Sequence, residues 1–216
     1  MRAIPAGLLA LRKANLYLAI SIAIFVLAAA MLNQLALALS PVALLFTLGY
    51  SLTKQFTWLC HFVLGFSLGI APSAAWIGVT GQITAAALAL TAAVTFWTAG
   101  FDIIYALQDD EFDRGRGLKS IPARFGRPRA LVISRICHVI AVASLVSAGL
   151  IYQAGPFYFV GAAAAAALLL YEQSLVKPSD LSKVNMAFFT LNGYVSIGVF
   201  LFALIDLWQR PNPLKP

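Results

Sequence analysis

Long apolar stretches separated by short polar or charged segments constrain this chain more than any other feature. Seven are expected, at about residues 16–39, 41–52, 58–79, 83–107, 130–151, 157–175 and 184–207. About 20 helical residues, rising about 1.5 Å each, cross the ~30 Å hydrocarbon core of a bilayer. The sequence therefore predicts an all-α, polytopic membrane helical bundle of about seven transmembrane helices. The short second span is expected to be tilted, or extended through Lys54 and Phe56.

Composition supports the same class of protein. Hydrophobic residues make up 61% of the chain and charged residues 11%, against about 45–50% and about 25% in an average soluble domain. The first stretch is long enough to span a bilayer and lacks a small-residue cleavage site, so it predicts a retained helix rather than a signal peptide. Cys60 and Cys137 lie alone in apolar stretches, which argues against a disulfide framework or a zinc site. Residues 1–216 are interpreted as a single transmembrane domain.

The placement of the basic residues predicts how the helical bundle is oriented in the membrane. If Met1 is cytoplasmic and the spans alternate, 13 of the 15 basic residues lie on the cytoplasmic side, and only Arg210 and Lys215 lie outside. The outer turns, expected near Ser40, Gln82 and Gln153, carry no charge. This bias follows the positive-inside rule. It predicts an integral protein of the cytoplasmic (inner) membrane with a cytoplasmic N-terminus, and it accounts for the net charge of +7 without a nucleic-acid partner.

The acidic residues are concentrated in one short segment. Five of the eight lie within twelve positions: Asp102, Asp109, Asp110, Glu111 and Asp113. On one continuous helix the first, second and last of these would fall within about 40° of one another. We therefore expect those three on one helical edge, facing a polar cavity, because a carboxylate at membrane depth needs a partner. The other two are expected to pair with Arg114 and Arg116 as solvated loop charges.

The chemistry of these ligands favours a hard cation. Oxygen donors without a nearby His or Cys are typical of Mg²⁺, which commonly takes one or two carboxylates together with substrate phosphates and water. A basic segment follows at residues 114–129. Metal-held carboxylates beside flexible cations make a site for a polyanion such as a diphosphate. The positive-inside rule by itself also accounts for the basic residues there, so the acidic edge is the stronger signal.

At this point the sequence resembles a known family. Residues 100–113 read Gly-Phe-Asp-Ile-Ile-Tyr-Ala-Leu-Gln-Asp-Asp-Glu-Phe-Asp, and residues 117–122 read Gly-Leu-Lys-Ser-Ile-Pro. This pattern is similar to the second aspartate-rich motif of the UbiA family of intramembrane aromatic prenyltransferases. Further landmarks agree in order: Arg2 to Gly7, Tyr50 with Lys54, and Asn192 to Tyr194, although Gln55 replaces the family's usual arginine. The resemblance covers essentially the whole chain and is closest to the 4-hydroxybenzoate polyprenyltransferase-like branch.

The resemblance implies a function and a set of site residues. The activity would be Mg²⁺-dependent transfer of a polyprenyl group from polyprenyl diphosphate to an aromatic acceptor, in ubiquinone biosynthesis with 4-hydroxybenzoate or in menaquinone biosynthesis with a dihydroxynaphthoate. The implied metal ligands are Asp109, Asp113 and Asp102. Arg2, Lys54 and Lys119 would contact the diphosphate; Asp102, Tyr105 and Lys119 would be catalytic; and Tyr50 and Asn192 would belong to the site. Tyr105 would stabilise cationic charge or donate a hydrogen bond, or else anchor the helix at the membrane interface.

One departure from the family pattern concerns the N-terminus. The family has nine helices, and its first aspartate-rich motif lies at the end of the second. The sequence starts just after the corresponding point. We therefore expect that it lacks the N-terminal two helices, holds half of a two-motif Mg²⁺ site and is inactive on its own.

Two hypotheses from different classes remain from the residues alone, a prenyltransferase and a membrane transporter. A membrane transporter would use the acids as a cation or proton relay, but a relay needs ionisable groups distributed through the bilayer, and here they gather at one end.

His61 and His138 stand alone in apolar stretches. For both, packing or interhelical hydrogen bonding is expected rather than ligation of a metal.

Overall fold

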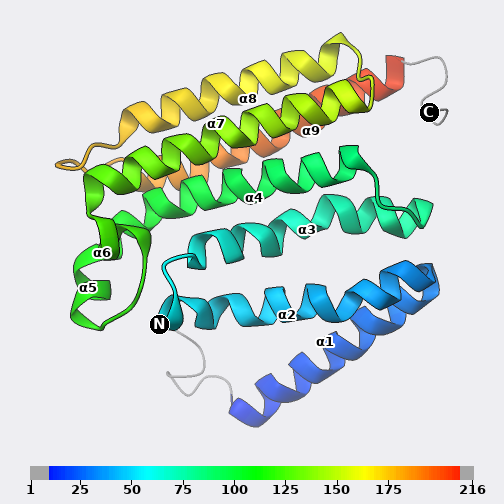
Figure 1. The fold of residues 1–216 in the computed structure, drawn as a ribbon, viewed down its shortest axis with the longest axis horizontal. Coiled ribbons are helices and arrows are strands. Elements are labelled where there is room, and N and C mark those ends of the chain that lie inside the picture. Colours follow the sequence, from blue (N-terminus) through cyan, green and yellow to red (C-terminus); the bar gives the residue numbers. More distant parts are fainter. Residues whose placement is uncertain (1–9, 210–216) are drawn as a thin grey trace.

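The structure, a computed structural model, describes residues 10–209 and consists of long helices lying side by side (Figure 1). The long helices are α1 (Leu11–Leu32), α2 (Gln34–Phe56), α3 (Cys60–Thr80), α4 (Ala85–Ala106), α7 (Arg127–Ile151), α8 (Pro156–Leu175) and α9 (Asn192–Gln209). Shorter helical segments are η1 (Leu107–Asp109), α5 (Asp110–Gly115), α6 (Ile121–Phe125) and η2 (Met186–Leu191). The described residues contain seven helices long and apolar enough to cross a membrane. The all-α membrane fold is confirmed.

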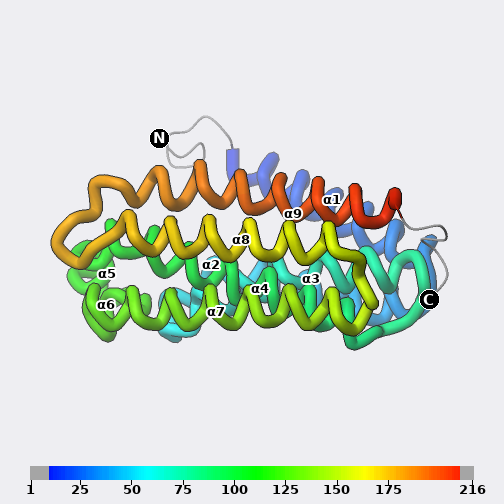
Figure 2. Tube along the Cα trace, turned by 90° about the horizontal axis from the view of Figure 1, so that it is seen from above, coloured from blue at the N-terminus to red at the C-terminus, as the bar shows by residue number. Residues whose placement is uncertain are grey.

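Helix α4 lies at the centre of the bundle. It packs against α3 on one side and α7 on the other, and α8 packs against α9 (Figures 1 and 2). The largest buried cluster includes Ile103, Ile104 and Leu107 near the end of α4, together with Ile121 of α6 and Leu131 of α7. The core is therefore densest beside the segment that carries the acidic residues.

Small residues allow α3 and α4 to approach closely. A Cβ atom added to Gly65 would overlap the Thr95 carbonyl oxygen, and one added to Gly69 would overlap the Thr95 hydroxyl. Without a strong hydrophobic driving force between helices in lipid, such close backbone approach is a main source of helix association. Gly65 and Gly69 therefore support tight packing of α3 against α4.

The predicted boundary between the first two spans is wrong. The break lies at Asn33, and Ser40 and Pro41 are inside α2. The Asn33 side chain caps α2 by accepting from Ala36 N at 2.8 Å, and its amide donates to Ile77 O at 2.7 Å. Pro41 has no N–H to offer four residues back, and the Ser40 hydroxyl instead donates to that carbonyl, Leu37 O, at 2.8 Å. The second span is consequently of full length.

The prediction that Asp102, Asp109 and Asp113 share one edge of a continuous helix is also wrong. Helix α4 ends at Ala106, a short 3₁₀ turn covers 107–109, and α5 begins at Asp110. A buried carboxylate needs a partner, and Asp110 finds Arg127 at the start of α7, away from the axis of α4. The chain therefore leaves regular α-helical geometry after Ala106, and the spacing of 100° per residue that placed Asp102, Asp109 and Asp113 on one edge does not hold across the 3₁₀ turn.

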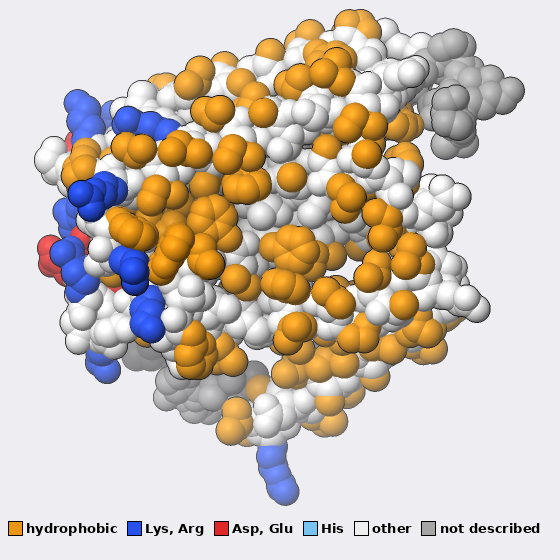
Figure 3. Space-filling model, viewed as in Figure 1, with side chains coloured by type: hydrophobic (Ala, Val, Ile, Leu, Met, Phe, Trp, Pro, Cys, Tyr) orange, Lys and Arg blue, Asp and Glu red, His pale blue; other side chains and the backbone are white. Residues whose placement is uncertain are grey.

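Most charged residues gather at one end of the bundle, whereas Asp206 of α9 is buried near the opposite end, where it accepts from Gly155 N at 2.9 Å and from Tyr158 N at 3.3 Å. Figure 3 shows Lys and Arg side chains, with the few acidic ones, at the end where α5 and α6 lie, beside a surface rich in hydrophobic side chains. The uncharged turns around Asn33, Gln82 and Gln153 lie away from it. The alternation of spans predicted from charge is thus seen in the bundle, and the protein is an integral membrane protein.

Candidate functional site

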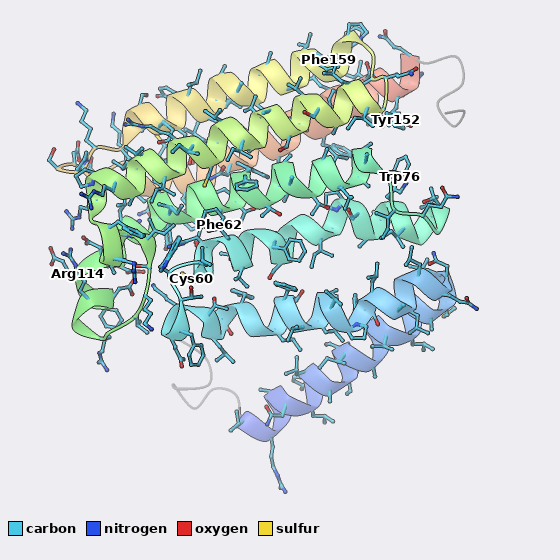
Figure 4. The ribbon with its side chains drawn as sticks, in the orientation of Figure 1. Cys60, Phe62, Trp76, Arg114, Tyr152 and Phe159 are labelled. Carbon is cyan, nitrogen blue, oxygen red and sulfur yellow. The ribbon has the colours of Figure 1, made fainter. Side chains whose placement is uncertain are left out.

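The candidate site lies where the end of α2, the start of α3, the end of α4 and the α5–α6 segment meet. Figure 4 shows Cys60 at the start of α3, at the same end of the bundle as Arg114 of α5. Segments far apart in sequence are joined here by hydrogen bonds, so the site is built by tertiary structure and not by one motif.

Asp113 is the most enclosed member of the predicted ligand set. It is 1% exposed, and its Oδ2 lies 2.8 Å from Lys54 Nζ and accepts from the Ser120 hydroxyl at 2.8 Å. Its other oxygen, Oδ1, is buried and has no hydrogen-bond partner within the described part of the chain. A buried anionic oxygen without a donor is costly, and a bound cation would satisfy it.

The segment around Lys119 is fastened to the α2–α3 connection. Lys119 N donates to Lys54 O at 2.7 Å, and Lys119 Nζ donates to Phe56 O at 3.1 Å. The Cys60 thiol donates to Lys119 O at 3.4 Å. Lys54 is partly exposed and Lys119 is exposed, so two residues implicated by sequence are joined through the backbone at this end of the bundle, while their ammonium groups contact Asp113 and Phe56 O respectively.

Asp102 meets a residue that sequence reasoning did not assign to the site. Its Oδ2 lies 2.6 Å from His61 Nδ1 of α3, and His61 Nε2 accepts from Ile121 N at 3.2 Å. His61 is 2% exposed, whereas the Asp102 side chain is 22% exposed. The expectation of interhelical hydrogen bonding for His61 is confirmed. Its partners were hidden because they lie 41 and 60 residues away in sequence.

Asp110 corrects the expectation of solvated loop charges. It is 1% exposed and accepts from Arg127 through both carboxylate oxygens, at 2.8 and 3.1 Å, and from Arg114 at 2.6 Å. Pairing with Arg114 was predicted, whereas burial and the bond to Arg127 were not. Glu111, by contrast, is 84% exposed and 3.6 Å from Arg127. Asp110 therefore anchors α5 to α7.

The remaining predicted residues are more dispersed. Asp109 is exposed, and its side chain makes no hydrogen bond or ion pair with a described residue. Tyr105 stacks on Phe188 at a ring-centroid distance of 4.2 Å. Asn192 accepts from Trp97 Nε1 at 2.8 Å and donates to Phe188 O at 2.9 Å, which supports the π-helical turn η2. Tyr50 is exposed on α2. Arg2 lies outside the described residues.

The donor set fits Mg²⁺ in part. Within residues 10–209, no three His, Cys, Asp or Glu side chains are grouped closely enough to hold a metal ion. The predicted trio of carboxylates is therefore not assembled. The free Oδ1 of Asp113 nevertheless suits a cation that takes one or two carboxylates and fills its other positions with phosphate oxygens and water.

An apolar cavity of about 350 Å³ lies between α1, α2, α3 and α4. Its walls include Phe25, Ala43, Phe66 and Ile70. Phe66 follows His61 by five residues, or about 7.5 Å along the axis of α3. The polar site thus stands at one end of a helix whose next turns line an apolar space.

Comparisons with known proteins agree with this fold and motif. The family model described as the UbiA prenyltransferase family matches residues 1–194. The 4-hydroxybenzoate octaprenyltransferase of Vibrio parahaemolyticus serotype O3:K6 is 29% identical over 96% of this chain and 72% of that protein. The enzyme of the same name from Aromatoleum aromaticum is 30% identical over 97% and 71%.

A solved structure is similar as well. The apo structure of a UbiA homolog from Aeropyrum pernix K1 superposes with a TM-score of 0.84 at 33% identity, covering 94% of this chain and 75% of that one. The predicted enzyme class, a prenyltransferase, is confirmed by these relatives. This chain belongs to the UbiA prenyltransferase family.

Proposed function

We propose that this protein transfers a polyprenyl group from polyprenyl diphosphate to a 4-hydroxybenzoate-like ring, a step of ubiquinone biosynthesis. One observation carries the proposal: Lys54, Lys119, Asp113 and Asp102 converge at one end of the bundle, and an apolar cavity lies farther along the same helices, toward the opposite end. Such a site offers charge for a diphosphate head and apolar surface for a prenyl tail. The family relationship supports the same activity.

The diphosphate head would bind at the charged end. Lys54 and Lys119 present ammonium groups there, and each is a compact point charge suited to phosphate oxygens. Mg²⁺ held by Asp113, with Asp109 as a second ligand, would neutralise the diphosphate as it departs. Ser120 donates to Asp113 at 2.8 Å and thereby fixes the orientation of that carboxylate. Arg2 remains a proposed further contact.

The prenyl tail would enter the apolar cavity between α1 and α4. The cavity begins along α3 beyond His61 and is walled by aliphatic and aromatic side chains. Burying apolar chain surface contributes about 25 cal/mol per Å². The tail therefore supplies binding energy, while the charged end positions the bond that breaks.

The chemistry follows from this placement. The allylic C–O bond breaks, its electron pair leaves with the diphosphate, an aromatic ring carbon attacks the allylic carbon, and the ring then loses a proton. Charge stabilisation of the leaving group is commonly the largest contribution to such catalysis. Asp102, beside the head group, would orient the reactants. The Tyr105 ring would face cationic charge, an interaction of about 0.5–2 kcal/mol.

We further propose that the charged end, with the N-terminus, is cytoplasmic in an inner membrane. The support is the concentration of described basic residues at the end of the bundle that carries α5 and α6 (Figure 3). Positive charge near helix ends favours the cytoplasmic side. Cysteine labelling from either face of sealed vesicles, with a cysteine placed at exposed Gly115 in a background without Cys60 and Cys137, reads this orientation directly.

The test of the proposed function is binding of farnesyl diphosphate to the purified protein in lipid nanodiscs. Binding is expected with Mg²⁺ and not with EDTA, and Asp113→Asn and Asp109→Asn are each expected to weaken it. Asp180→Asn, which changes an exposed carboxylate in the α8–η2 connection, is the matched control and should bind as the unmodified protein does. Undiminished, Mg²⁺-dependent binding by both site variants would contradict the metal assignment.

The acceptor is tested separately. Membranes containing the protein, expressed with whatever its gene encodes before residue 1, are supplied with farnesyl diphosphate and either 4-hydroxybenzoate or a dihydroxynaphthoate, and the prenylated product is quantified. Preferential prenylation of 4-hydroxybenzoate supports the proposal. Preferential prenylation of the naphthoate would assign the protein to menaquinone biosynthesis instead.

A further inference from the structure

His61 joins two parts of the charged end that are far apart in sequence. On one side its Nδ1 lies 2.6 Å from Asp102 Oδ2 on α4, and on the other its Nε2 accepts from Ile121 N, at the start of α6, at 3.2 Å. The ring is 2% exposed. A single buried side chain thus connects α3, α4 and α6.

The two contacts define which ring nitrogen carries the hydrogen. A backbone N–H can only donate, so His61 Nε2 must present its lone pair to Ile121. The hydrogen of the neutral ring then resides on Nδ1, which donates to Asp102. In many sites the hydrogen bond at one imidazole nitrogen sets the role of the other in this way.

The consequence for Asp102 is a fixed orientation. One oxygen is held by His61, and the other, Oδ1, accepts no hydrogen bond from residues 10–209. The Asp102 side chain is partly exposed, so its free oxygen can be reached by a bound ion or ligand at the charged end of the bundle. A carboxylate held by one oxygen and open at the other is ready to bind a further group.

The second consequence is that residues 119–121 are held in a fixed position against the start of α3. The Cys60 thiol donates a hydrogen bond to Lys119 O, and the next residue, His61, accepts a hydrogen bond from Ile121 N. Ser120, between these two contacts, donates to Asp113. The first residues of α3 therefore position both a cation and the residue that orients Asp113.

We propose that His61 is a positioning residue, whose neutral ring turns the free oxygen of Asp102 toward the divalent cation of the proposed site and fixes the position of residues 119–121, so that Lys119 faces the diphosphate bound to that cation. This inference rests on the proposed function. It assigns no proton transfer to His61, which is too enclosed to touch the substrate. Its contribution passes through Asp102 and the Lys119 segment.

The experiment compares His61→Leu, which removes both contacts, with His61→Gln, whose amide offers one donor and one acceptor. His61→Leu is expected to lower the Mg²⁺-dependent affinity for farnesyl diphosphate or the kcat of prenyl transfer by about 10–100-fold, the usual effect of losing such a partner. His61→Gln should restore most of the loss. His138→Gln, at an equally buried histidine of α7, is the matched control and should leave both values unchanged.

A double substitution separates positioning from general stability. If His61 acts in part through Asp102, adding His61→Leu to Asp102→Asn should cost less than the same change costs in the unmodified protein, because only the effect on the Lys119 segment remains to be lost. Losses that multiply would overturn the inference, as would a His61→Leu protein that binds and reacts normally.

A measurement on the unmodified protein keeps the inference testable if His61→Leu does not fold. Nitrogen-15 NMR of labelled histidine should show hydrogen on Nδ1 and none on Nε2 of His61. Hydrogen on Nε2 would overturn the proposal. Failure of the unmodified protein to bind farnesyl diphosphate would instead contradict the proposed function, which this NMR result does not test.

Discussion

Two buried histidines flank α4, and their surroundings differ. On the α3 side, His61 contacts partly exposed Asp102 and the backbone of Ile121, beside Lys54 and Asp113. On the α7 side, His138 and Ser134 both contact Gln173 of α8, and the Ser134 hydroxyl donates to Gly100 O. We call these the His61 cluster (His61, Asp102, Ile121) and the His138 cluster (Ser134, His138, Gln173).

The difference shows that a polar residue in a membrane helix serves one of two purposes. The His138 cluster joins α4, α7 and α8, and the described residues provide it with no ion pair. Interhelical hydrogen bonds of this kind hold helices together. The His61 cluster leads to a carboxylate with a free oxygen and to neighbouring lysines. Only the second arrangement is suited to binding a charged substrate.

The largest expected effect is on the rate of prenyl transfer, which should fall when the His61 cluster is changed and not when the His138 cluster is changed. Asp102→Asn should reduce prenyl transfer on the order of 100-fold, because it removes a negative charge that would hold a divalent cation against the diphosphate head group. Ser134→Ala, in the other cluster, should leave the rate within about two-fold, since its hydroxyl contributes to helix packing. Steady-state transfer in membranes with matched protein content measures both. Equal losses would remove the distinction between the clusters.

A smaller effect concerns stability on the α7 side. A Cβ atom at Gly100 would overlap the His138 ring, so Gly100→Val should destabilise the protein by about 1–3 kcal/mol through overpacking. Gly198→Val is the control, because no atom lies within 4 Å of its added Cβ. Thermal unfolding in detergent compares the two variants. A Gly100→Val protein as stable as the control would contradict the close α4–α7 packing.

Removing hydrogen bonds from the His138 cluster should cost less still. Gln173→Leu removes the hydrogen bonds to Ser134 and His138 and is expected to destabilise the protein by about 1.2 kcal/mol, at an average of about 0.6 kcal/mol for each interhelical hydrogen bond in a membrane protein. Farnesyl diphosphate affinity should not change. Denaturant titration and the nanodisc binding assay measure the two quantities, and a large loss of affinity would show that this cluster belongs to the site.

The smallest effect is expected at an exposed acid of the charged end. Glu111 is 84% exposed and 3.6 Å from Arg127, and such surface ion pairs contribute little. Glu111→Gln should therefore change neither binding nor unfolding measurably. A reproducible loss of farnesyl diphosphate binding would show that the total charge at this end of the bundle affects affinity, and not only the individual oriented side chains.

Much of the fold could be predicted because apolar length reports directly on membrane helices. The error at Ser40 and Pro41 arose because hydropathy does not register capping: Asn33 ends one helix and begins the next with its own side chain. Proline usually marks a helix end, and here a serine hydroxyl compensates for its missing donor.

The site could be predicted only as a motif. The motifs pointed to four residues that lie at the charged end: Asp102, Asp113, Lys54 and Lys119. The prediction of one acidic edge assumed a continuous helix. The helix is interrupted instead, next to a buried ion pair between Asp110 and Arg127 that the sequence did not reveal. The link from His61 to Asp102 spans 41 residues and leaves no local pattern. The lone histidine in an apolar stretch was the available signal, and it predicted a hydrogen bond without its partner.

The central claim is that the charged end beside α3 holds the diphosphate with a divalent cation. The most direct test is an experimental structure of the protein with Mn²⁺ and farnesyl thiodiphosphate, in which anomalous scattering locates the metal. We predict a metal peak within coordination distance of Asp113, with the diphosphate beside Lys54 and Lys119. A metal and diphosphate bound elsewhere, with Asp113 contacting neither, would contradict the account.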